Sequence, residues 1–281
     1  MRKALLGVFL VASASAFAGI ELPQASPAAA ASLKVGTTNV TIEYHRPAVK
    51  GRAIWGGLVP YEQVWRLGAN EATTFEVSDP VKVAGHDVPA GTYALFAVPG
   101  RDTWTIVLNK QAKQWGAFSY KQDQDLVRFQ VTPTAAPFKE WMALSVEPTG
   151  PQTAEVVMTW EKLRVAFPVE VDVPGLVWGT ITRQIANPDA SPEDFFQAAK
   201  YSLDQGGHRD EALGWAEKAL AGKPMFWTLE LKARLLQREG RTSEALPLVD
   251  KAIADSVGKA PKEYTDMLKK VAEEWKAASA K

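Results

Sequence analysis

The sequence contains no cysteine. This absence excludes disulfide bonds, a catalytic thiol and any cysteine-ligated metal, so the fold depends on apolar burial and hydrogen bonds. Histidine is scarce as well: His45, His86 and His208 are the only three, and they lie far apart in the chain. We therefore expect no zinc or copper site and no cofactor. An oxygen-only calcium site at Lys121–Asp125 stays open, although such an acidic and polar turn is more often a solvated loop.

Neither sign of charge is in excess. The chain has 32 lysines and arginines against 32 aspartates and glutamates, and its formal net charge is zero. A balanced surface argues against nucleic acid as the main partner. Long apolar runs are missing too, because no segment reaches the roughly 20 residues that a membrane-spanning helix needs. The sequence therefore predicts neither a nucleic-acid partner nor a membrane span.

Residues 1–18 have the features of a secretory signal peptide. Arg2 and Lys3 form a basic start, an apolar stretch follows, and the Ala-Phe-Ala sequence at 16–18 is a cleavage signal. Residues 19–32 are small and proline-containing, as in a linker. Since no cysteine is available at the cleavage site, we expect no N-terminal lipid anchor. The predicted protein is exported from a bacterial cell and is periplasmic or extracellular.

From residue 33 to residue 172 the apolar positions recur with a period of two, which is typical of strands. About nine short runs of this kind follow one another without helical segments between them. This pattern predicts an all-β domain, an antiparallel sandwich of jelly-roll-like type. One stretch, from Arg46 to Thr73, is a loop-like region that is long for a compact domain and too apolar to be disordered.

After residue 172 the periodicity becomes helical. Residues 173–190 are predicted to form a connecting helix or linker, and residues 191–281 an all-α domain. The segments Gly207–Leu220 and Gly240–Ile253 share Glu-Ala-Leu and Lys-Ala pairs at a spacing close to the roughly 34 residues of tetratricopeptide repeats. We expect two tetratricopeptide-like hairpins and a final helix. Trp215, Phe226 and Trp227 are candidates for a peptide-binding groove or for packing within the protein.

Three motifs carry a resemblance to a known family. They are Tyr-x-Arg-Pro, Lys-Gly-Arg and Val-Trp-Arg-x-Gly-Ala-Asn, which fall here on Tyr44, Arg46 and Pro47, on Lys50, Gly51 and Arg52, and on Val64, Trp65, Arg66, Gly68, Ala69 and Asn70. The chain resembles a family of exported bacterial proteins known only as a domain of unknown function, whose longer members continue into a tetratricopeptide-like tail. The resemblance implies the architecture and no activity, so it assigns no catalytic residue.

The same region supplies the candidate binding residues. They combine guanidinium groups with aromatic faces and polar side chains, a chemistry that suits carboxylates, phosphates and sugars: Tyr44, Arg46, Arg52, Trp65, Arg66, Asn70 and Glu71. A structural interpretation is also open. In it Arg46 and Arg66 pair with acids or loop carbonyls, the tryptophans fill the end of the sandwich, and Asn70 bonds to its own loop.

The function hypothesis follows from these residues. No nucleophile motif is present, so we favour a non-enzymatic binding or scaffolding protein of the cell envelope. Its β domain would take a small anionic or carbohydrate ligand, and its helical tail would contact a protein or peptide. The alternative is a hydrolase of envelope glycans or peptides with a carboxylate base, for which Glu71 is preferred over Glu43, Glu62 and Glu76. A purely structural interaction protein is the third hypothesis.

Overall fold

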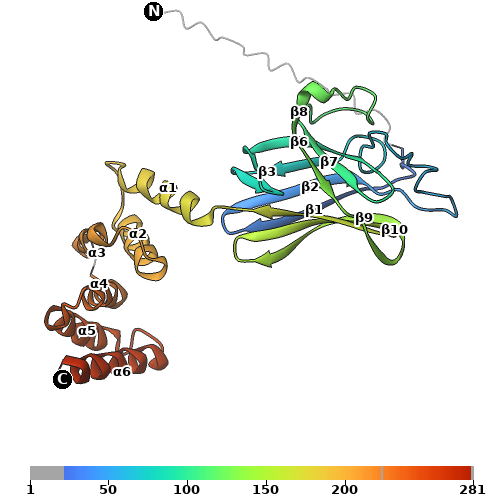
Figure 1. Ribbon diagram of the computed structural model, residues 1–281. Helices are drawn as coiled ribbons and strands as arrows, with labels where there is room; N and C mark the ends of the chain where they lie inside the picture. Colours follow the sequence, from blue (N-terminus) through green and yellow to red (C-terminus); the bar gives the residue numbers. More distant parts are fainter. Residues whose placement is uncertain (1–21, 223, 280–281) are drawn as a thin grey trace, which may run out of the picture. The chain divides into compact units, whose positions relative to one another are not determined.

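The computed structural model of the chain describes residues 22–222 and 224–279. These residues fall into two compact units, one ending at Val173 and the other beginning at Pro174. Within the described residues the first unit contains ten strands in two antiparallel sheets and the second contains six helices (Figure 1). The predicted signal peptide at residues 1–18 lies outside the described residues.

The larger sheet has six strands in the order β1-β2-β3-β6-β7-β8. Their bounds are β1 Ala28–Val35, β2 Thr38–His45, β3 Thr74–Val77, β6 Gly91–Val98, β7 Trp104–Asn109 and β8 Asp125–Val131. Burial alternates along β2, where Val40, Ile42 and Tyr44 are buried and Glu43 is exposed. Because successive side chains of a strand point to opposite faces, this sheet has an inner face in the core and an outer face.

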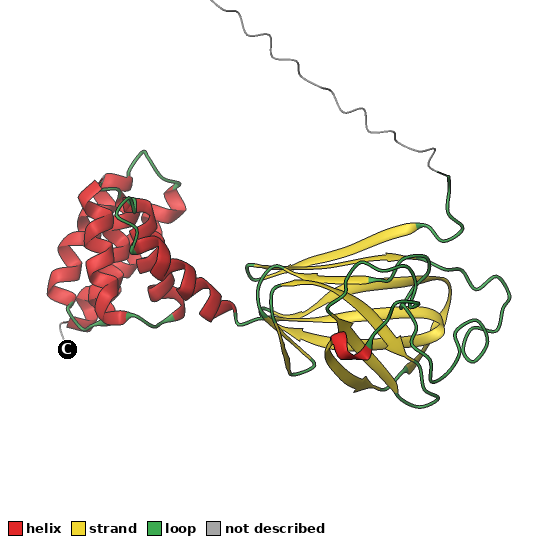
Figure 2. Cartoon of the chain, turned by 90° about the horizontal axis from the view of Figure 1, so that it is seen from above, coloured by secondary structure: helices red, strands yellow, loops and turns green. Residues whose placement is uncertain are grey.

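The smaller sheet has four strands in the order β5-β4-β10-β9. Their bounds are β4 Val81–Val83, β5 His86–Val88, β9 Thr134–Gly150 and β10 Thr153–Glu170, and a short 3-10 helix, η1, covers Gln122–Gln124. Strands β9 and β10 form one long hairpin (Figure 1), and Figure 2 shows the strands of the first unit in yellow. Between Thr159 and Leu163 its register shifts, and Glu161 has a φ of 54°. A bulge of this kind bends a strand without ending it.

Aromatic rings connect the two sheets. Phe129 of β8 meets Phe167 of β10 edge to face, with ring centroids 5.4 Å apart. Trp160 of β10 and Trp104 of β7 are both fully buried. The ring centroid of Trp55 lies 4.9 Å from that of Trp104 and 5.7 Å from that of Trp160. Without disulfides, this aromatic burial is a main source of cohesion in the unit.

Strand β1 lies partly where we expected a linker. It begins at Ala28, whereas the β region was expected to begin at residue 33, and it pairs with β2 along its full length. A run of alanines has no apolar alternation and little strand preference, so its sequence gives no strand signal. The pairing with β2 supplies the backbone hydrogen bonds that local preference does not.

The second unit is helical throughout. Its helices are α1 Val173–Ile185, α2 Pro192–Gln205, α3 Arg209–Gly222, α4 Phe226–Arg238, α5 Thr242–Ser256 and α6 Lys262–Ser279. Ser191 caps α2 through a capping box with Asp194, and Gly240, with a φ of 75°, lies in the turn after α4. Trp215 is buried in the core of this unit, while Trp227 is 38% exposed. No helix in the described ranges is long and apolar enough to cross a membrane.

Candidate functional site

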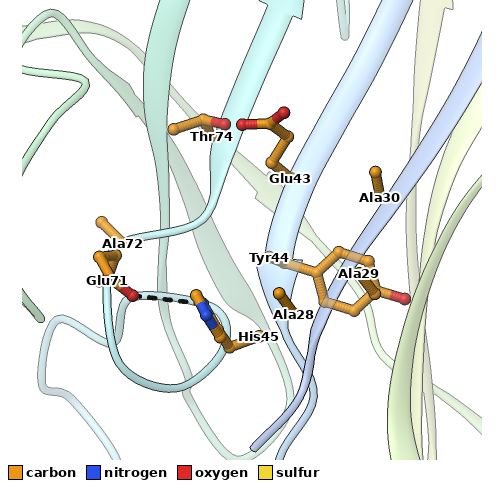
Figure 3. Close-up of a pocket in the computed structure, with 9 residues that line it drawn as sticks. All are labelled: Ala28, Ala29, Ala30, Glu43, Tyr44, His45, Glu71, Ala72 and Thr74. Carbon is orange, nitrogen blue, oxygen red and sulfur yellow. Dashed lines mark ion pairs between the residues drawn. The ribbon is translucent and has the colours of Figure 1, made fainter. Parts of the chain in front are cut away.

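The outer face of the larger sheet carries an open depression of about 490 Å³ (Figure 3). Its lining comes from β1, β2 and the loop that leads into β3: Ala28, Ala29, Ala30, Glu43, Tyr44, His45, Glu71, Ala72 and Thr74. Strand pairing places Ala28 opposite His45, Ala30 opposite Glu43, and Glu43 opposite Thr74. Residues that face each other in an antiparallel pair share one face, so the polar groups gather on the outer face and the small alanines leave room above them.

Two of these polar side chains form an ion pair. The Nδ1 atom of His45 lies 3.4 Å from Oε2 of Glu71, and the interaction carries opposite charges when the imidazole is protonated. The His45 side chain is 18% exposed and that of Glu71 is 51% exposed. Figure 3 shows the pair at the loop end of the depression, with the Glu43 carboxylate beside Thr74 further along the strands. The polar surface of the depression is therefore rich in hydrogen-bond acceptors.

The loop that carries Glu71 is held in place by its neighbours. Asn70 adopts a left-handed conformation, with a φ of 56°, which asparagine tolerates better than most residues. Its Nδ2 atom donates to Oε1 of Gln24 at 2.5 Å and to the carbonyl of Ser26 at 3.3 Å. Asn70 thus ties the loop to the segment before β1, and not to its own backbone as the structural interpretation expected. The hydroxyl of Thr73 donates to the carbonyl of Leu67 at 2.7 Å and closes the loop internally.

Arg46 and Arg52 bind backbone carbonyls. Arg46 donates from Nε to the carbonyl of Met142 in β9 at 2.8 Å. Arg52 donates from Nη2 to the carbonyl of Ala48 at 2.6 Å and from Nε to that of Val49 at 3.1 Å. Neither arginine is among the described residues that line the depression. Both arginines therefore hold the path of the backbone at this end of the sheet.

Arg66 differs from the other two arginines. Its Nε atom is buried and has no hydrogen-bond partner within the described part of the chain. Burial lowers the pKa of its guanidinium, because the charged form loses solvation there. Glu71, one of the acids that the structural interpretation offered as a partner, pairs with His45. Arg66 is therefore a half-buried charge that no carboxylate compensates among residues 22–222 and 224–279.

Trp65 and Tyr44 point toward the core. Trp65 stacks on Trp160 with ring centroids 5.9 Å apart, and its Nε1 atom donates to the carbonyl of Gly68 at 3.1 Å. The Tyr44 hydroxyl donates to the carbonyl of Leu144 at 3.3 Å, and the ring points away from His45 in Figure 3. Tyr44 therefore contributes only part of its surface to the depression.

The structure thus gathers part of the predicted set. Tyr44 and Glu71 line the depression and Asn70 holds its loop, whereas Arg46, Arg52 and Trp65 have structural contacts elsewhere. Three further residues join the site through strand register. Glu43 was considered only as an alternative carboxylate base, His45 only as a metal ligand, and Thr74 not as a site residue. Within the described ranges, no group of three or more histidines and acids is placed to hold a metal ion.

Comparison with known proteins places the first unit in a family. Residues 26–169 match the model of a family described as "Protein of unknown function (DUF2911)", which is just over half of the chain. The chain belongs to this family. No curated protein and no solved structure matches it. The family description assigns no activity, so the function of this DUF2911 domain is argued from its site.

A second loop of the DUF2911 domain is hydrogen-bonded to the loop that carries Glu71. The amide of Ala72 donates to the carbonyl of Gln114, and the amide of Gly116 donates to the carbonyl of Asn70, each at 3.0 Å. These bonds place Glu71 opposite Trp115 in a short antiparallel bridge. The site therefore combines two carboxylates, one imidazole and one hydroxyl over an alanine floor. That set can accept hydrogen bonds from a ligand.

Proposed function

We propose that the DUF2911 domain is a non-enzymatic binding module for a small carbohydrate of the cell envelope. The observation that carries this proposal is the composition of the depression, in which Glu43 and Glu71 present carboxylate oxygens and Thr74 a hydroxyl. Sugar hydroxyls donate hydrogen bonds, and a bond to a charged carboxylate is stronger than a bond to a neutral acceptor. The alanine floor leaves space for a ring.

Of the two ligand classes expected from the sequence, the anionic class has less support from the depression. The arginines that would attract it, Arg46 and Arg52, already donate to backbone carbonyls and are not among the described residues of the lining. Two carboxylates in one depression repel an anion, and no lysine or arginine is among the described residues that line it. The charge pattern therefore favours a neutral, hydroxyl-rich ligand.

The His45–Glu71 pair supports a second candidate function. A carboxylate beside an imidazole is an arrangement that general-base chemistry uses, so hydrolysis of an envelope glycan or peptide with Glu71 as base is the alternative. Loss of all turnover in Glu71→Gln with unchanged ligand affinity would favour this alternative. Turnover that persists in Glu71→Gln would remove it.

We also propose the remaining parts of the sequence hypothesis. The basic and apolar leader supports export to the periplasm or the extracellular space. The ring contacts between the two sheets support a jelly-roll-like sandwich, and the consecutive helix contacts of α2 to α6 support a tetratricopeptide-like unit. The 38% exposure of Trp227 on α4 supports a protein or peptide contact there. The third hypothesis is a purely structural role, and binding of a sugar in the experiment below would argue against it.

The test measures binding of neutral and acidic oligosaccharides by calorimetry for the wild type, Glu43→Gln and Glu71→Gln. We expect neutral sugars to bind and each substitution to weaken them about tenfold, the worth of a charge-assisted hydrogen bond. The matched control is Glu76→Gln, because Glu76 is exposed on the same face of β3 but outside the depression. Removing a carboxylate would instead strengthen an anionic ligand. That increase, or the absence of binding to any sugar, would overturn the proposal.

A further inference from the structure

Two aromatic side chains project from one loop of the DUF2911 domain. Phe118 is 86% exposed and Trp115 is 59% exposed, and both lie between the end of β7 and η1. Large apolar side chains that stand together on a surface commonly mark a contact with another apolar phase. We define the docking loop as residues 110–121.

The exposure of these rings is not a result of a loose loop. The amide of Lys110 donates to the carbonyl of Gln124 at 2.9 Å, and Nδ2 of Asn109 donates to that of Lys121 at 3.0 Å, so the two ends of the loop lie close together. Such a closed loop is a compact unit of its own. Within the loop the side chain of Gln114 is buried, and its Nε2 atom donates to the carbonyl of Gln111 at 2.8 Å.

The inner side of the docking loop packs on the outer face of the larger sheet. Ala117 and Tyr120 contact a buried cluster that includes Phe96 and Val107. The Tyr120 ring meets that of Phe96 edge to face at 5.3 Å, and its hydroxyl donates to Oδ2 of Asp125 at 2.7 Å. The loop thus partly buries the Tyr120 ring against the sheet, while Trp115 and Phe118 stay exposed.

The charge of the docking loop is of one sign. Lys110, Lys113 and Lys121 are all exposed, and no ion pair to any of them is present within the described part of the chain. The loop contains no acidic residue, although the whole chain has equal numbers of acids and bases. The acids beside the loop are Glu71, opposite Trp115, Asp123, which follows the loop, and Asp125, which accepts from the Tyr120 hydroxyl and pairs with Arg128. Exposed aromatics flanked by unpaired lysines are complementary to a surface that is apolar within and negative at its boundary.

We propose that residues 110–121 dock the DUF2911 domain onto an anionic lipid bilayer. Trp115 and Phe118 enter the boundary between headgroups and acyl chains, where indole and phenyl rings are favourable. Lys110, Lys113 and Lys121 face the anionic headgroups and extend their charges toward them. Because the loop is already ordered, docking requires little loss of conformational freedom. The inference is independent of the carbohydrate ligand proposed above.

The experiment is co-sedimentation of the full chain, without its predicted leader, with vesicles. One set consists of phosphatidylcholine and the other of phosphatidylcholine mixed with phosphatidylglycerol. We expect binding to the mixed vesicles only, and weaker binding as salt is added, because salt screens the lysines. Lys113→Gln and Lys121→Gln should each lower the partition coefficient about fivefold, since one basic residue near an anionic surface contributes about that factor.

The aromatic part is tested with Trp115→Ser combined with Phe118→Ser, which should reduce partitioning by about tenfold or more. The matched controls are Phe138→Ser and Lys139→Gln, an exposed aromatic and an exposed lysine on β9. They should bind as the wild type does. The lysine variants keep the test valid if the double variant does not fold. Equal binding to both vesicle types, or equal losses in the controls, would overturn the proposal.

A different partner for the same loop would have a distinct signature. If Trp115→Ser abolished sugar binding and no vesicle bound the wild type, Trp115 would be a stacking residue of the ligand site and membrane docking would be wrong. Failure of the carbohydrate proposal leaves the vesicle result unchanged, because Glu43→Gln and Glu71→Gln lie outside the docking loop. The two proposals therefore fail separately.

Discussion

The half-buried charge of Arg66 predicts that removing this charge stabilises the protein. Its Nε atom is buried without a hydrogen-bond partner, and an unsatisfied buried polar group costs about 1–3 kcal/mol. Methionine has a similar unbranched stem and no polar hydrogen, so Arg66→Met keeps the packing of the stem and removes this cost. Because the guanidinium is only half-buried and keeps some solvation, we expect a gain near the lower limit, about 1 kcal/mol.

Arg46→Met is the matched control. It deletes the bond from Nε to the carbonyl of Met142, a charge-assisted contact that joins the end of β2 to β9. Losing such a bond in a partly buried position should destabilise the protein by about 1–2 kcal/mol. The two arginines belong to the same loop region, so the same substitution is expected to shift stability in opposite directions.

Urea unfolding of the full chain measures both variants. Hydrogen exchange of the strand amides follows the first unit, and the helical circular dichroism band follows the second, so a change can be assigned to its unit. A loss in Arg66→Met as large as that in Arg46→Met would refute the reasoning. Such a loss would mean that the Arg66 guanidinium has a stabilising partner, and the loop would then be a charged clamp.

Three further predictions test other parts of the structure. Burial and the hydrogen bond to Asp125 raise the pKa of Tyr120 from its ordinary 10.0 to about 12. Between these two pH values the unfolded chain releases the proton first, so the free energy of unfolding falls as the pH rises. After a discount for the partial exposure of Tyr120, this fall is about 1 kcal/mol. Tyr120→Phe should remove it in urea titrations at stepped pH. Ser191→Ala breaks the capping box with Asp194 and should cost about 1 kcal/mol in the thermal unfolding of the helices. Trp160→Leu opens the aromatic core and should cost about 3 kcal/mol in urea, with the loss confined to the first unit.

The strands were predictable where burial on one face imposes a period of two. Val40, Ile42 and Tyr44 alternate with polar residues in β2, and the structure buries all three. Strand β1 was not predictable from its own residues, because alanines carry no such alternation and only pairing with β2 makes them a strand. The helical unit was clearer, since Ser191 with Pro192 marks a helix start and Gly240 marks a turn.

The candidate site was only partly predictable, for a related reason. Glu71 drew attention because it lies in a long apolar loop, and it does line the depression. Glu43 and Thr74 meet only through the register of β2 and β3, which no local pattern in either strand encodes. The carbonyls that bind Arg46 and Arg52 are backbone atoms, present at every residue, so their selection depends on the folded path of the chain.

The candidate site and the docking loop are joined by short connections. The amide of Ala72 bonds to Gln114 and the amide of Gly116 bonds to Asn70, so Glu71 and Trp115 are held opposite each other. A domain docked through Trp115 would therefore hold the depression close to the membrane surface. Its ligand would then meet the site most often as the headgroup of a glycolipid. Loop variants such as Lys113→Gln should accordingly weaken binding to a vesicle-anchored sugar while leaving affinity for the same free sugar unchanged.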